Sequence, residues 1–170
     1  AILAGRLGKS VEPYLAAAAK ALPDYCFPAR LEDIAALQAA IGANPADGRA
    51  PCYLGNLLYD RRRHADAIAM WERSVAIDPS WSIPWRNLGI AYFNIERSEP
   101  KAVAAYDKAL AANPRDARLV YERDQLWKRI GRSPAERLTE LESRLDLVAS
   151  RDDLSVELSA LYNQLGQSEK

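Results

Sequence analysis

Residues 85–92 read Trp85-Arg-Asn-Leu-Gly-Ile-Ala-Tyr92, and a related stretch, Tyr53-Leu-Gly-Asn-Leu-Leu-Tyr59, comes before it. The Leu-Gly pairs of the two stretches lie 34 residues apart. Prolines, which cannot continue a helix, follow at nearly the same interval. A period near 34 with a stop after each cycle predicts an internal repeat of helical hairpins. The stops are Asn44-Pro45, Asp78-Pro79 and Asn113-Pro114.

This arrangement resembles the tetratricopeptide repeat, which has Trp, Leu-Gly and Tyr on a first helix and Ala, an aromatic residue, Ala and Pro on a second. Residues 48–79 match with two departures, Pro51 in the Trp place and Ser74 in an Ala place. A glycine inside a helix costs ~1 kcal/mol relative to alanine, so Gly55 and Gly89 indicate close helix packing. Residues 82–114 supply nearly the whole pattern: Trp85, Leu88, Gly89, Tyr92, Ala102, Tyr106, Ala109 and Pro114.

The match weakens on both sides of these two repeats. In residues 117–151, Arg123-Asp124 replaces Leu-Gly, which predicts a different packing angle, and Leu138, Leu141 and Leu145 are expected on the second helix. We predict an all-α fold, a right-handed superhelical stack of antiparallel helix hairpins with about nine helices. Its expected parts are a divergent N-terminal helix pair in 1–47 (helices over 11–22 and 31–41), repeats in 48–81 and 82–116, a divergent hairpin in 117–151, and the first helix of a further repeat in 152–170.

The last predicted helix presents four leucines that have no partner later in the chain, which favours a portion excised from a longer repeat protein. Alternatively, the last helix itself caps the stack. Residues 121–137 and 157–166 also resemble the repeat region of large, uncharacterised bacterial proteins that carry a β-rich domain ahead of the repeats. That resemblance implies at most a loose tie to carbohydrate metabolism. The leucines are Leu154, Leu158, Leu161 and Leu165.

The composition narrows the class of protein. Lys and Arg number 23, as do Asp and Glu, so no overall field favours nucleic acid. No apolar run reaches the length of a membrane span, and residues 1–6 lack the pattern of a signal peptide. We therefore expect a cytoplasmic protein that binds neither nucleic acid nor membrane. Cys26 and Cys52 lack CxxC spacing and predict neither a disulfide framework nor a metal site.

Residues that could support catalysis have simpler structural explanations. His64 is the single histidine, and a solvated side chain in the predicted turn 60–66 accounts for it. The preceding run, 61–63, contains three arginines whose charges suit the exposed carbonyls at a helix end. Ser133 and Glu136 have capping-box spacing, and Asp152-Asp153 stands where a helix begins. We predict no enzyme activity, no cofactor and no metal.

The resemblance implies that five places on each first helix line a concave groove. Of the twenty residues at these places, five are basic and two are acidic, so we expect a mildly cationic groove with an apolar and aromatic floor. Aromatic and arginine side chains carry much of the energy of protein interfaces. The predicted partner-binding residues are Arg49, Cys52, Asn56, Tyr59, Arg86, Asn87, Ile90, Phe93, Arg118, Tyr121, Lys128 and Arg129.

Some members of the family clamp a terminal carboxylate with Lys, Asn and Arg side chains. Asn56, Asn87 and Arg118 occupy three of those places, but Cys52 replaces a Lys and Glu122 an Arg, which argues against a clamp. Our leading hypothesis is a protein-interaction scaffold that binds an acidic or mixed peptide in the groove.

Two other hypotheses stay open at this point. One is a structural spacer or self-association module of a larger, carbohydrate-related protein, with a homodimer formed through the stack ends. The other is a carbohydrate-binding groove that uses Tyr59, Phe93 and Tyr121.

Overall fold

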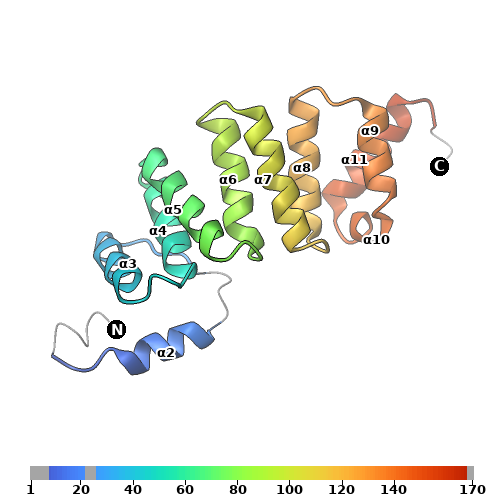
Figure 1. Cartoon of the computed structure of the whole chain (residues 1–170). Coiled ribbons are helices and arrows are strands. Elements are labelled where there is room, and N and C mark those ends of the chain that lie inside the picture. The colour runs from blue at the N-terminus through green and yellow to red at the C-terminus, as the bar shows by residue number, and fades with distance from the viewer. Residues whose placement is uncertain (1–7, 22–25, 168–170) are drawn as a thin grey trace. The chain divides into compact units, whose positions relative to one another are not determined.

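The computed structural model describes residues 8–21 and 26–167, which form ten helices and no strand (Figure 1). The prediction of an all-α fold is confirmed for this part of the chain. The chain divides into two compact units, Ala1–Ile77 and Asp78–Lys170. Residues 22–25, which hold the end of the predicted 11–22 helix and part of the following linker, lie outside the described residues, as do residues 1–7 and 168–170.

The first unit contains α2 (Glu12–Lys20), α3 (Leu31–Ala43), α4 (Arg49–Asp60) and α5 (His64–Ile77). Helices α4 and α5 form a tight hairpin around Gly55. A Cβ atom added to Gly55 would lie 2.6 Å from both Cδ1 and Nε1 of Trp71. The indole Nε1 of Trp71 donates a hydrogen bond to Asn56 Oδ1 at 3.0 Å. The glycine is therefore needed because the tryptophan ring of the second helix lies against the first.

Ser74 explains one departure from the repeat pattern. It stands in a place where the repeat has alanine, and it is fully buried. Its Oγ donates a hydrogen bond of 2.7 Å to the carbonyl of Gly48, immediately before α4. The hydroxyl thus satisfies a buried backbone acceptor, which makes its burial tolerable.

The second unit begins with the hairpin of α6 (Ser82–Asn94) and α7 (Glu99–Ala112). These two helices share the most extensive pairing among the described residues. A Cβ atom on Gly89 would lie 2.6 Å from Cδ2 of Tyr106, so the tyrosine ring fills the place that a larger residue would need. In both central hairpins, an aromatic ring of the second helix thus lies against a glycine of the first.

The rest of the second unit contains α8 (Ala117–Arg129), α9 (Pro134–Glu142), α10 (Leu145–Val148) and α11 (Asp152–Gln164). Helix α9 contacts α11 more than it contacts α8, and α8 and α9 approach each other far less than α6 and α7 do. The hairpin that contains Arg123-Asp124 thus pairs less extensively than the central hairpin does, and the predicted difference in packing angle stays a prediction. The carboxylate at the glycine place, that of Asp124, accepts hydrogen bonds from Arg137 of α9.

The second helix of this hairpin ends earlier than the sequence predicts. The expectation that Leu145 belongs to its apolar face is wrong, because α9 ends at Glu142 and Leu145 is 52% exposed. The chain restarts as the four-residue α10, which buries Leu147 and Val148 instead. This additional short helix raises the number from the expected nine to ten in the described part.

Two leucines of the last helix have partners within the unit. Leu154 and Leu161 are fully buried in a cluster with Leu141 and Leu147 from α9 and α10. Leu158 and Leu165 are partly buried against the same cluster. The four leucines therefore pack against residues that come earlier in the chain.

The predicted capping box is confirmed at the start of α9. Ser133 Oγ accepts from the backbone N–H of Glu136 at 3.3 Å, and the Glu136 carboxylate accepts from the Ser133 N–H at 3.1 Å. In α11, Asp153 lies in the first turn and pairs with Arg151, as expected for a carboxylate at a helix start. None of the helices described is both long and apolar enough to span a bilayer.

Candidate functional site

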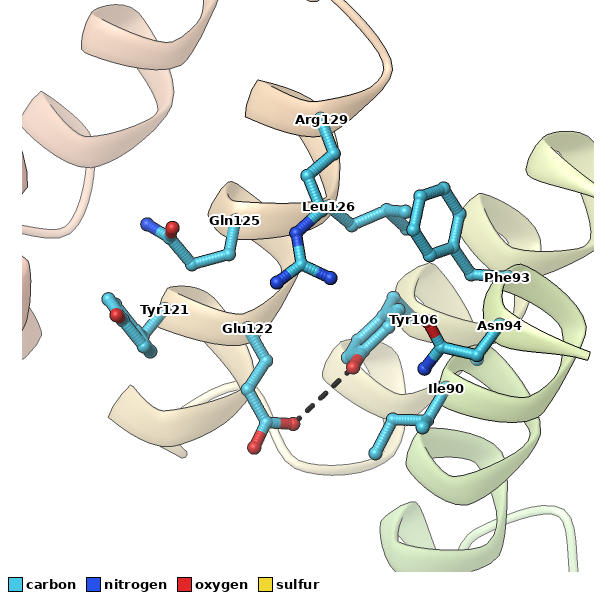
Figure 2. Close-up of a pocket in the computed structure, with 10 residues that line it drawn as sticks. Ile90, Phe93, Asn94, Tyr106, Tyr121, Glu122, Gln125, Leu126 and Arg129 are labelled. Carbon is cyan, nitrogen blue, oxygen red and sulfur yellow. Dashed lines mark hydrogen bonds between the residues drawn. The ribbon is translucent and has the colours of Figure 1, made fainter.

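Helices α6, α7 and α8 of the second unit surround a hollow of about 300 Å³ (Figure 2). It lies where the first helices α6 and α8 were expected to face a partner. Three of its apolar side chains, Ile90, Phe93 and Tyr121, are half-buried, and a fourth, Leu126, is buried. The full lining is Gly89, Ile90, Phe93, Asn94, Tyr106, Tyr121, Glu122, Gln125, Leu126 and Arg129.

The charge at one edge of the hollow is organised by Glu122. Its carboxylate accepts two hydrogen bonds from Arg86, from Nε and from Nη2, both at 2.6 Å. Arg118, one turn earlier on α8, donates from Nε at 2.9 Å. The hydroxyl of Tyr106 lies 3.5 Å from the same carboxylate (Figure 2). Glu122 therefore joins side chains from α6, α7 and α8.

The environment of this cluster shifts two pKa values. Burial works to lower the pKa of Arg86, but the hydrogen bonds and charge of Glu122 outweigh it and hold the pKa above its ordinary value. Burial, with the neighbouring charge of Glu122, raises the pKa of Tyr106. Arg86 is thus a fixed cation and Tyr106 a neutral hydroxyl at neutral pH.

Arg129 has a different environment. It is exposed, and within residues 8–21 and 26–167 its guanidinium has neither an ion pair nor a side-chain hydrogen bond. Figure 2 shows its side chain extending from α8 over the hollow. Arg129 is therefore the cation of this lining that a ligand can reach without displacing a carboxylate of the protein.

Two other predicted residues of the second unit are already engaged. The ammonium of Lys128 lies 2.9 Å and 3.0 Å from the two carboxylate oxygens of Glu157 on α11. The amide oxygen of Asn87 accepts from Arg86 Nη1 at 3.3 Å. The cationic groove expected from the sequence is therefore largely neutralised by carboxylates of the protein itself.

The predicted residues of the first unit take part in contacts within that unit. Arg49 donates from Nη1 to the backbone carbonyls of Ala18 and Ala21, at 3.4 Å and 3.0 Å, and so caps the end of α2. Cys52 is fully buried, and burial raises the pKa of its thiol. The expectation that Cys52 meets a partner is therefore wrong, because the side chain faces the core of the unit.

Tyr59 and Asn56 support the hairpin of the first unit. The ring of Tyr59 lies 5.3 Å from that of Trp71 and 4.8 Å from that of His64, measured between centroids. Asn56 is the acceptor for the indole of Trp71. His64 is the first residue of α5 and half-buried, so the expectation of a solvated turn histidine is wrong.

Four residues predicted on first helices line one hollow in the structure: Ile90, Phe93, Tyr121 and Arg129. The sequence did not predict that Tyr106, on a second helix, lines the hollow as well. From the sequence, Glu122 was expected to repel a ligand carboxylate, because its pairing with Arg86 and Arg118 was not foreseen. No sequence pattern indicates the pairing of Arg86 with Glu122, because the two residues are 36 positions apart and lie on different helices.

The described residues hold no cluster of side chains suited to a metal ion. Nowhere in this part of the chain do three or more His, Cys, Asp or Glu side chains come together in a way that could hold a metal ion. The hollow itself contains one carboxylate, and that carboxylate is held by two guanidinium groups.

Comparison with known proteins supports the fold. No family model matches the chain. A crystal structure of MamA superposes with a TM-score of 0.66 and 20% identity, over 80% of this chain and 78% of that one. YrrB, a TPR protein with an unusual peptide-binding site, gives 0.64 and 21%, over 77% of this chain and 66% of its own. At this identity the similarity concerns architecture alone: the helical hairpins have the fold of tetratricopeptide-repeat proteins.

Proposed function

We propose that this chain is a protein-interaction scaffold, and that the hollow between α6, α7 and α8 holds a peptide with one acidic group and one apolar side chain. The observation that carries the proposal is the position of an uncompensated guanidinium, that of Arg129, beside half-buried apolar side chains. The fold supports it, since a solved protein of this fold has a peptide-binding site. The proposal assigns no catalytic step to the chain.

The size and lining of the hollow favour a short peptide segment. A volume of about 300 Å³ is at the lower end of ligand pockets, and it accommodates one or two side chains. Ile90, Phe93 and Leu126 provide apolar surface that a leucine or aromatic side chain of the ligand can bury. The polar rim, Asn94 and Gln125, offers amides for the backbone of the peptide.

The charge of the lining favours an acidic ligand. Arg129 and Glu122 are the charged residues of the lining, and the carboxylate of Glu122 is already paired with Arg86 and Arg118, which lie outside it. An arginine beside a carboxylate forms short, charge-assisted hydrogen bonds, often as a two-pronged pair. A ligand carboxylate placed at Arg129 therefore gains such a pair at no expense to the pairs within the protein.

Synthetic peptides test the proposal directly. Ten-residue labelled peptides carry one Phe and one Asp at varied spacings on a Ser-Ala background, and a matched set carries Lys in place of Asp. Fluorescence anisotropy measures their dissociation constants. We expect the Asp set to bind more tightly, and Arg129→Glu to weaken its binding at least ~tenfold and to favour the Lys set, since ~1.4 kcal/mol corresponds to tenfold.

Two comparisons complete this test. Arg73→Glu makes the same change of charge on an exposed residue of α5 in the first unit and should leave binding unchanged. Phe93→Ala should weaken both peptide sets, because the apolar contact is shared. Arg86→Glu is unsuitable, because it would place two carboxylates together at Glu122. Equal binding of the Asp and Lys sets would contradict the proposal.

A further inference from the structure

The ion cluster of Arg86, Glu122 and Arg118 has the geometry of an occupied anion site. Arg86 holds the carboxylate in a two-pronged pair, and Arg118 adds a third hydrogen bond from the side. Two guanidinium groups that converge on one carboxylate are what proteins use to recognise acidic ligands. Here the carboxylate belongs to the protein, on the same helix as Arg118.

The cluster is in contact with the hollow. Glu122 lines it, and the side chain of Glu122 keeps 17% of its exposure, against 20% for Arg86 and 60% for Arg118. Tyr106, whose hydroxyl approaches the carboxylate, lines the hollow too. A ligand that enters the hollow therefore meets Glu122, with both guanidinium groups behind it already paired.

The position of the remaining cation completes the argument. Arg129 lies two turns along α8 from Glu122 and lines the same hollow, without a carboxylate partner in the described chain (Figure 2). A ligand with a single acidic group can pair with Arg129. A ligand with two adjacent acidic groups, or a phosphate, would bring a second negative charge close to Glu122, where the cations are neutralised.

We infer that Glu122 is a specificity-determining residue: it occupies the Arg86–Arg118 anion site from within and so restricts the hollow to ligands with a single acidic group, held at Arg129. This inference rests on the proposed function, because it describes which peptides the same hollow accepts. It also predicts a property that no peptide is needed to detect. Removing the carboxylate of Glu122 unmasks an anion site.

The first test uses inorganic phosphate as the probe and Glu122→Gln as the variant. Glutamine keeps the length of the side chain and an oxygen acceptor for Arg86 but removes the charge. Phosphate is titrated against ¹⁵N-labelled protein, and the arginine Nε–H signals are followed by NMR. We expect saturable shifts of the Arg86 and Arg118 signals in the variant, with an affinity at least ~tenfold above that of the unchanged protein.

Adding Arg118→Gln to this variant should abolish the gain, which locates the anion between the two arginines. The second test uses peptides with one Asp or with an Asp-Asp pair. The unchanged protein should prefer the single Asp, and Glu122→Gln should bind the Asp-Asp peptide at least ~tenfold more tightly than the unchanged protein does. A role of Glu122 limited to holding the helices together would produce no such gain.

Glu122→Asp guards against loss of folding, because it keeps the charge and only shortens the reach to the two guanidinium groups. It should give an intermediate gain, while circular dichroism reports the helix content of each variant. If Glu122→Gln and Glu122→Asp fold but bind phosphate no more tightly than the unchanged protein, the inference is overturned. It is also overturned if neither variant folds, because Glu122 then has a structural role. If no peptide binds the unchanged protein, yet phosphate binds Glu122→Gln, the proposed function fails and the masked anion site stands.

Discussion

The two hairpins of the second unit, α6–α7 and α8–α9, share one layout but differ in chemistry at the place of the Leu-Gly pair. In the first, Leu88-Gly89 lets the ring of Tyr106 lie directly against the helix backbone. In the second, the equivalent pair is Arg123-Asp124, and the two helices approach far less closely. The pattern of helices is thus preserved although the interaction between them has changed.

The charged hairpin is built around a buried ion pair. Asp124 accepts from Nε and Nη2 of Arg137 at 2.8 Å and 2.6 Å, and both side chains are 5% exposed or less. Arg137 also donates to Glu157 of α11 at 2.9 Å. Arg123, likewise buried, pairs with Asp107 of α7 and Glu140 of α9. The ion pairs require specific atoms of neighbouring helices to meet, and so they constrain the orientation of those helices. The contact at Gly89 constrains only how close α6 and α7 lie.

The comparison teaches how α9 comes to pack on α11. Apolar packing at Gly89 favours the closest approach of two neighbouring helices, because dispersion and burial both increase with contact. Buried charges instead require partners at specific atoms, and Arg137 finds them on α8 and on α11 at once. Helix α9 is therefore bonded to α8 and to α11 through the same arginine.

The largest effect that we expect follows from removing one partner of the buried pair. Arg137→Leu leaves the Asp124 carboxylate buried without a cation, which should lower the free energy of unfolding by ~3–5 kcal/mol. Urea denaturation followed by circular dichroism measures it. The double variant Arg137→Leu/Asp124→Leu should recover most of the loss. A loss no greater than that of Arg115→Leu, which breaks an exposed pair with Asp146, would remove the contrast between the hairpins.

The second effect concerns the apolar hairpin. Gly89→Ala forces a Cβ to within 2.6 Å of the Tyr106 ring, and we expect a destabilisation of ~1–3 kcal/mol despite the better helix propensity of alanine. The urea midpoint measures it. Gly42→Ala in α3 is the matched control, because nothing lies within 4 Å of its Cβ position, and it should be neutral or stabilising. Equal behaviour of the two variants would show that the close approach is absent.

A third prediction sharpens the comparison at the helix starts. Helix α9 has a complete capping box, whereas Ser98, the N-cap of α7, makes no side-chain capping bond. Ser133→Ala should therefore cost ~1 kcal/mol, and Ser98→Ala almost nothing. Thermal unfolding of the two variants measures the difference. Similar losses would mean that α9 does not depend on its own cap more than α7 does.

The smallest effect is one of pH. Burial works to raise the pKa of Glu157, but hydrogen bonds from Lys128 and Arg137 outweigh it and hold the pKa below its ordinary value. In the unfolded chain the pKa of a glutamate is about 4.3. Because the pKa of Glu157 is lower in the folded state, the ionised carboxylate stabilises the fold above about pH 4.3. This stabilisation is lost as the pH falls through the folded-state pKa. Hydrogen exchange should show α9 and α11 losing protection at acidic pH before α6 and α7.

Glu157→Gln is the control for this effect. It should reduce the dependence of stability on pH below about 5, because the titrating group is gone. Parallel loss of protection in all helices of the unit at acidic pH would contradict the view that the ionic hairpin is the more acid-sensitive of the two.

Local patterns made much of the fold predictable. The 34-residue interval, the prolines after each second helix and the Leu-Gly pairs gave the central helices, and the Ser133–Glu136 spacing gave the start of α9. The end of α9 could not be predicted, because Leu145 fits a helical pattern equally well inside or outside the helix. Helix α9 ends where it does because Leu147 and Val148 are buried in the following short helix. They are buried against Leu154 and Leu161 of α11, which the local sequence does not reveal.

The candidate site was predictable only in part. The resemblance to the tetratricopeptide repeat implies that Ile90, Phe93, Tyr121 and Arg129 lie on the groove face of the first helices. It cannot indicate that Arg86 is neutralised, since its partner Glu122 lies on another helix. For the same reason, the burial of Cys52 could not be inferred from its place in the repeat.

By itself, the sequence of this protein determined its central helices, their hairpin order and the two glycines at which the helices pack closely. These depend on interactions within a few residues or on a period that is visible in the chain. Only the tertiary structure decided which cation of the α6–α8 face stays uncompensated, and that α9 packs on α11. Ion pairs between helices depend on the register of residues about 30 positions apart, and that register is fixed only when the helices pack.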